Sequence, residues 1–74
     1  MTHQVHKQLV DATILSYVDW REECAAVWDA FDRWASAPAA DAPTAFSAYR
    51  VALDREERAA HAYAEVLEAH RSDV

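Results

Sequence analysis

Ser36-Ala37-Pro38-Ala39-Ala40-Asp41-Ala42-Pro43 holds both prolines of the chain and separates two long stretches of helix-forming residues. Pro38 disfavours the α conformation at Ala37, so it ends the first helix. Asp41 suits the N-cap of the second helix, because Pro43 is tolerated in a first turn. A connection this short joins antiparallel neighbours. We therefore predict one all-α domain over residues 1–74, an antiparallel two-helix hairpin with helices at about 4–35 and 43–71 and a loop at about 36–42.

The composition around this break is strongly helical and contains no glycine among 74 residues. The absence of glycine excludes phosphate-binding loops, dinucleotide-binding turns and tight β-hairpins, all of which need it. Enzymes built on glycine-rich nucleotide loops are therefore excluded as a class.

The net charge of the chain limits the kinds of partner that it can bind. Thirteen acidic residues oppose seven Lys and Arg, which gives a formal net charge of -6. Nucleic acids and anionic membrane surfaces both require a basic patch. We therefore expect neither a nucleic acid nor a membrane as partner.

Cys24 is the only cysteine, so a disulfide cannot stabilise a single copy of the chain. A lone thiol is typical of a reducing compartment, and the first residues lack the apolar core of a secretory signal. No apolar run approaches the roughly 20 residues that span a bilayer. We expect a cytoplasmic protein.

The apolar residues follow helical periodicity, but on the first helix they cover about half of the circumference once Ile14, Val18 and Ala25 are counted. One partner helix covers a stripe of only about 100°. A dimer of hairpins, forming a four-helix bundle, would cover the remainder, since two-fold homodimers are the commonest assembly. A different helical protein supplying the missing helices is the rival partner. The side chains expected in this core and interface are Val10, Ile14, Tyr17, Trp20, Cys24, Val27, Trp28, Phe31, Trp34, Phe46, Tyr49, Leu53, Ala60, Tyr63 and Leu67.

Glu56 is the polar residue that the periodicity directs inward, between Leu53 and Ala60. Folding the chain about the loop brings it near the level of Arg21, so we expect a buried polar pair of Arg21 and Glu56. Such a pair fixes register more than it adds stability, because desolvation offsets the Coulomb attraction. A di-iron carboxylate site would need a Glu-x-x-His motif and further glutamates, which the chain does not offer.

The remaining chemical candidates are weaker. His3, His6 and His70 should lie near one end of the hairpin, where imidazoles on neighbouring turns could bind zinc or copper. Cys24 faces the predicted core and has no histidine at its level, so we interpret it as a packing residue. We expect no catalytic residue, no cofactor and no enzymatic activity.

The run Tyr17-Val18-Asp19-Trp20-Arg21-Glu22-Glu23-Cys24-Ala25-Ala26, with Ala48-Tyr49-Arg50 and Leu53-Asp54-Arg55-Glu56-Glu57 after it, resembles short Ala-rich helical proteins predicted from high-GC actinobacterial genomes. The resemblance covers most of the chain and implies a small stand-alone protein without assigned functional residues. The sequence thus predicts a small helical oligomerisation or protein-interaction module that forms homodimers. Two alternatives stay open, a ligand- or metal-binding helical bundle and a helical subunit of a hetero-complex.

Overall fold

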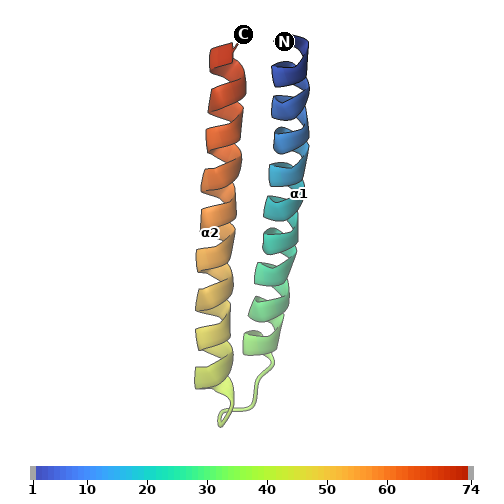
Figure 1. Cartoon of the computed structure of the whole chain (residues 1–74). Coiled ribbons are helices and arrows are strands. Elements are labelled where there is room, and N and C mark those ends of the chain that lie inside the picture. Colours follow the sequence, from blue (N-terminus) through green and yellow to red (C-terminus); the bar gives the residue numbers. More distant parts are fainter. Residues whose placement is uncertain (1, 74) are drawn as a thin grey trace.

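The computed structural model describes the backbone of residues 2–73 and the side chains of residues 7–72. Two long helices make up this part of the chain, α1 (Thr2–Ala35) and α2 (Ala42–Asp73). They run antiparallel and side by side, so that both chain ends lie at the end opposite the loop (Figure 1). The predicted all-α hairpin is confirmed, and both helices extend slightly beyond the outer ends expected from the sequence.

The loop closes through backbone hydrogen bonds on either side of Pro38. At the end of α1, the Ser36 N–H donates to the Asp32 carbonyl at 3.1 Å, and the Ala37 N–H donates to the Trp34 carbonyl at 3.2 Å. The second bond spans only three residues, which tightens the last turn before the proline. No described residue has a positive φ, so α1 ends without the left-handed cap that glycine would favour.

The start of α2 agrees with the prediction for Asp41. The Ala45 N–H donates to the Asp41 carbonyl at 3.0 Å, the first hydrogen bond of the helix, which places Asp41 at the N-cap. The Pro38 carbonyl accepts from the N–H groups of both Asp41 and Ala42, at 2.9 and 3.0 Å. Pro43 therefore lies inside the first turn, where its missing N–H costs no helical hydrogen bond.

The helices meet along one heptad-spaced row of side chains on each, which we call the central seam. Every residue of both rows is half-buried, apart from Ala52, which is buried. Alternating three- and four-residue steps of this kind are typical of coiled-coil packing. The seam comprises Leu9, Thr13, Ser16, Trp20, Glu23, Val27, Ala30 and Trp34 of α1 with Ala42, Ala45, Tyr49, Ala52, Glu56, Ala59, Tyr63, Val66 and His70 of α2.

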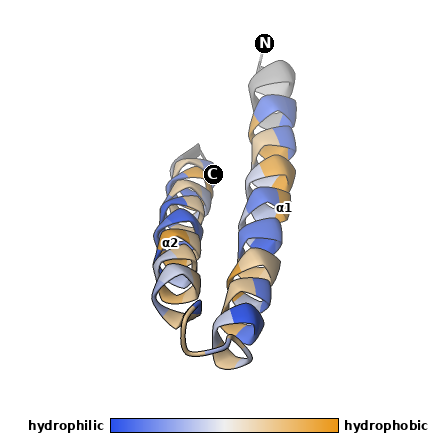
Figure 2. Ribbon diagram, turned by 90° about the horizontal axis from the view of Figure 1, so that it is seen from below, coloured by the Kyte–Doolittle hydropathy of each residue, from blue (hydrophilic) through white to orange (hydrophobic). Residues whose placement is uncertain are grey.

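The central seam corrects the detail of the predicted core. Trp20, Val27, Trp34, Tyr49 and Tyr63 lie in the seam as expected. The other predicted core residues lie outside it: Val10, Cys24 and Ala60 are half-buried, while Ile14, Tyr17, Trp28, Phe31, Phe46, Leu53 and Leu67 are exposed. Hydrophobic and hydrophilic residues accordingly alternate over the visible surfaces of both helices (Figure 2).

The hairpin is a thin rod of 58 × 14 × 12 Å with a radius of gyration of 16.9 Å. A compact domain of this length has a radius of gyration of about 11 Å. Neither helix, within residues 2–73, carries a stretch long and apolar enough to cross a membrane.

Candidate functional site

A second heptad row runs beside the central seam on each helix, one residue further along the chain. Because the helices are antiparallel, a step of one residue along either of them rotates the side chain toward the same side of the pair. Both rows therefore lie on one face of the hairpin, which we call the apolar face. It comprises Val10, Ile14, Tyr17, Arg21, Cys24, Trp28, Phe31 and Ala35 of α1 with Phe46, Arg50, Leu53, Glu57, Ala60, Ala64 and Leu67 of α2.

Most of the exposed large hydrophobic side chains of the described residues lie on this face. Trp28 is 68% exposed and Ile14 is 57% exposed. Seven of the ten such side chains belong to the apolar face, and only Leu15, Val18 and Val51 lie elsewhere. Within residues 7–72, exposed large hydrophobic side chains are therefore concentrated on one side of the hairpin.

Aromatic rings connect the apolar face to the central seam. The rings of Trp20 and Tyr63 stack at 5.7 Å and 14°, and Tyr17 on the apolar face contacts both of them. Near the loop, Trp34 and Tyr49 stack at 5.5 Å and 18°, flanked by Phe31 and Phe46 of the apolar face. Such ring pairs add about 0.5–1.5 kcal/mol each beyond their buried area. The two clusters fix the register of α1 against α2.

Glu56 lies in the central seam, half-buried as expected, but its partner differs from the predicted one. The Trp20 Nε1–H donates to Glu56 Oε1 at 2.9 Å. Arg21 is exposed, and the single ion pair found within residues 7–72 joins Arg71 and Glu68 on the surface of α2. The predicted Arg21–Glu56 pair is therefore wrong, because Arg21 lies one position beyond the seam, on the apolar face.

A shallow pocket of about 210 Å³ opens on the apolar face, lined by Cys24, Val27, Trp28, Leu53 and Glu56. Its lining includes residues of both helices, which confirms that Cys24 and Trp28 share a face with Leu53. Cys24 is half-buried and reduced. Among the other residues that line the pocket only Glu56 is polar, and a carboxylate does not activate a thiol for nucleophilic attack.

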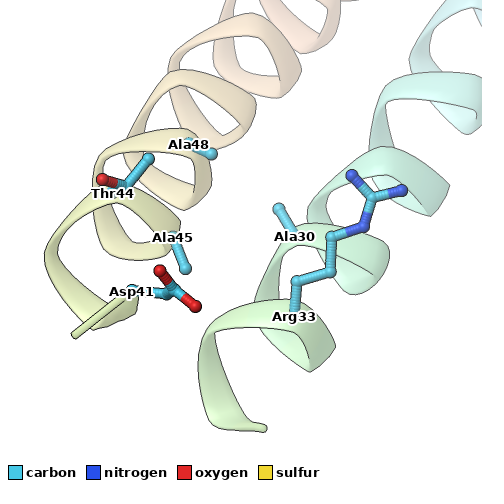
Figure 3. A pocket seen from close by; sticks show the side chains of 6 residues that line it. All are labelled: Ala30, Arg33, Asp41, Thr44, Ala45 and Ala48. Carbon is cyan, nitrogen blue, oxygen red and sulfur yellow. The ribbon is translucent and has the colours of Figure 1, made fainter. Parts of the chain in front are cut away.

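The opposite face carries a groove of about 310 Å³ near the loop, lined by Ala30, Arg33, Asp41, Thr44, Ala45 and Ala48 (Figure 3). The side chains of Arg33 and Asp41 extend from opposite walls, and the guanidinium of Arg33 points away from the carboxylate. Both side chains are exposed, so the groove offers no buried polar group that would select a ligand.

The predicted histidine cluster is only partly described. His70 lies half-buried in the central seam, whereas the side chains of His3 and His6 lie outside the described residues. Among residues with described side chains, no group of three or more His, Cys, Asp or Glu gathers closely enough to hold a metal ion.

Sequence reasoning missed the phase of the central seam and the Trp20–Glu56 hydrogen bond. The signal available was the alanines of α2: Ala45, Ala52 and Ala59 recur at seven-residue intervals. Small side chains at that spacing let two helices approach closely, and the same row contains Glu56. The hydrophobicity of the side chains instead favoured the large apolar residues one position further along each helix as core residues.

Comparisons with protein-family models, with curated proteins and with solved structures each found no match.

Proposed function

We propose that this protein is a small helical oligomerisation and protein-interaction module, which forms a homodimeric four-helix bundle through its apolar face. The observation that carries the proposal is the distribution of exposed hydrophobic side chains, most of which lie on one face of the hairpin. Helix bundles bury such faces against one another.

The surface area of the hairpin supports this proposal. The chain exposes 5820 Å², whereas a compact monomer of its size exposes about 4,600 Å². The excess is on the order of 1,000 Å², and each partner in a stable protein interface buries about 800 Å². A second copy covering the apolar face would bring the exposed area per chain to that of an ordinary globular protein.

The near absence of a core within one copy supports the proposal in a second way. Ala52, at 8% exposure, is the single buried hydrophobic residue among those whose side chains are described. Chains of this length need disulfides, metals or a partner chain for stability, and the single Cys24 excludes an intrachain disulfide. The lone thiol also suits a reducing compartment, so we place the module in the cytoplasm.

Sedimentation equilibrium at micromolar concentration tests the proposal, with two substitutions that differ mainly in the face they alter. Trp28 and Leu15 are almost equally exposed, 68% and 65%, but only Trp28 lies on the apolar face. We expect a dimer for the wild-type chain and for Leu15→Asp. Trp28→Asp should be monomeric or largely unfolded, because it places a charge in the interface.

A folded wild-type monomer would contradict the proposal, and equal behaviour of the two variants would show that the wrong face was chosen. Should the isolated chain aggregate and a co-expressed helical protein restore it, the hetero-complex would replace the homodimer.

A further inference from the structure

We propose, on the basis of the homodimer above, that the two hairpins pack with their loops at the same end of the bundle. In this arrangement α1 of each copy lies across from α2 of the other, and Arg21 pairs with the partner's Glu57. The apolar face thereby selects a second copy of this chain in one orientation. The charges, the side-chain sizes and the position of the pocket on the face each favour this orientation.

Arg21 and Glu57 lie close to one another in height on the apolar face. The ring contacts Tyr17–Tyr63 and Phe31–Tyr49 set the register of the two helices. In this register Glu57 is level with Cys24, which is three residues, or about 4.5 Å, along α1 from Arg21, a separation that the long arginine side chain spans. Both charged residues are exposed members of the apolar face. The only ion pair within residues 7–72 joins Arg71 and Glu68, so these two charges do not pair within one copy.

A two-fold axis can join the two apolar faces in two ways. An axis along the bundle puts the loops together and sets each Arg21 within one helical turn of the partner's Glu57, which gives two ion pairs. An axis across the bundle puts the loops at opposite ends and sets α1 against α1. Arg21 lies near the midpoint between Val10 and Ala35, so that second arrangement brings Arg21 within one helical turn of the partner's Arg21, and Glu57 within one turn of the partner's Glu57. Opposite charges at such positions select partner and orientation in helical bundles.

Side-chain sizes favour the same orientation. The ring contact between Trp34 and Phe46, 4.9 Å between centroids, shows that Phe46 is level with the end of α1. With the loops together, Phe46 meets the partner's Ala35, which is small. The contact between Tyr17 and Tyr63 places Ala64 at the height of Tyr17, so this ring also meets a small side chain. Large side chains facing small ones interdigitate well.

Arg50 adds a third argument. The Phe31–Tyr49 ring contact, at 5.8 Å, sets Arg50 at the height of Phe31. With the loops together, its guanidinium reaches the partner's Trp28 and Phe31, where an arginine over an aromatic face is stabilised by the ring quadrupole. With the loops apart, the same arginine would face Ala64 and Leu67 and would lose its hydration without a compensating contact.

The pocket between Cys24, Trp28 and Leu53 fits this arrangement as well. It lies at the height of Trp28, the most exposed aromatic side chain of the described residues. A copy with its loop at the same end brings the partner's Trp28 to that height. In the alternative, the partner's Tyr17 rather than its Trp28 lies at that height.

Distance measurement between loops tests the orientation directly. The chain Cys24→Ala/Ala39→Cys, carrying a nitroxide on the exposed loop residue 39, gives one spin label per copy. We expect an intermolecular distance much shorter than the 58 Å length of the hairpin. A distance near that length would overturn the orientation while leaving the dimer intact. No intermolecular distance, together with a monomer in sedimentation, would refute the dimer itself and with it the orientation.

Charge reversal gives an independent readout. With the loops together, Arg21→Glu replaces two attractions by two repulsions, so the dimer dissociation constant should rise at least tenfold at low salt. Arg21→Glu/Glu57→Arg restores both pairs and should bring the constant back to within about threefold of wild type. If Arg21→Glu leaves the constant unchanged, the orientation is wrong, because with the loops apart this variant only exchanges one like-charge contact for another.

Discussion

Glu56 shows how one side chain within the seam depends on its partner. Its carboxylate is half-buried and accepts a hydrogen bond from the Trp20 indole at 2.9 Å. A carboxylate in that position would be costly if it had no donor, because partial burial removes part of its hydration. The same indole stacks on Tyr63. The Trp20 indole thus donates a hydrogen bond to Glu56 and also packs against the ring of Tyr63.

Removal of the indole N–H should therefore destabilise the fold. We expect Trp20→Phe to lower the free energy of unfolding by about 1–3 kcal/mol, because the half-buried Glu56 side chain loses its hydrogen-bond donor. Urea denaturation followed by far-UV circular dichroism, at one fixed protein concentration, measures the change.

Two variants separate the hydrogen bond from the loss of ring area. Glu56→Gln keeps an oxygen that accepts from Trp20 and should cost under about 1 kcal/mol. Trp20→Phe/Glu56→Leu removes both polar partners and should be more stable than Trp20→Phe alone. If the double variant is no more stable, packing of the indole, rather than its hydrogen bond, accounts for the effect.

At the level of the helices, the loop ends α1 and begins α2 through two different sets of interactions. α1 ends because of Pro38, with a tightened last turn and a hydrogen bond from the Ser36 hydroxyl to the Asp32 carbonyl at 2.7 Å. α2 begins at Asp41, whose carbonyl accepts the first helical hydrogen bond. Its carboxylate makes no hydrogen bond with any described residue. Asp41 therefore acts on the helix through its negative charge.

Asp41→Ala should lower the free energy of unfolding by about 0.3–1 kcal/mol, the usual contribution of a charge at a helix N-terminus. Asp41→Asn should lower it by nearly as much, since the amide loses the charge. Chemical denaturation at low ionic strength measures both changes. Added salt should reduce the difference in the free energy of unfolding between each variant and the wild type, because salt screens the charge. Full retention of stability by Asp41→Asn would show that a side-chain hydrogen bond, and not the charge, caps α2.

For the molecule as a whole, the ratio of surface to interior is the governing property. A rod 58 Å long and 14 × 12 Å in cross-section leaves every seam residue close to solvent. This geometry explains why one small alanine is the single buried hydrophobic residue within the described part of the chain. The dimer proposed above would make the stability of the fold depend on protein concentration.

The melting temperature should accordingly fall on dilution. For a two-state dimer, tenfold dilution removes about 1.4 kcal/mol per dimer, which corresponds to about 4 °C for a bundle of twice this length. Thermal melts at about 2, 20 and 200 μM protein, monitored by circular dichroism, measure the shift in melting temperature for each tenfold dilution. A melting temperature independent of concentration would indicate that the hairpin is stable as a monomer.

The amino-acid sequence alone determined the two helices, the position of the break and the antiparallel hairpin, because Pro38, Asp41 and Pro43 act through local backbone sterics and capping. It also revealed an apolar arc too wide for one partner helix. Only the tertiary structure decided which of two adjacent heptad rows faces inward. The rows are about 100° apart on the helix, and hydrophobicity has no direction, so composition could not separate Trp20 from Trp28. In the structure Trp20 lies in the central seam, whereas Trp28 lies one position beyond the seam, on the apolar face.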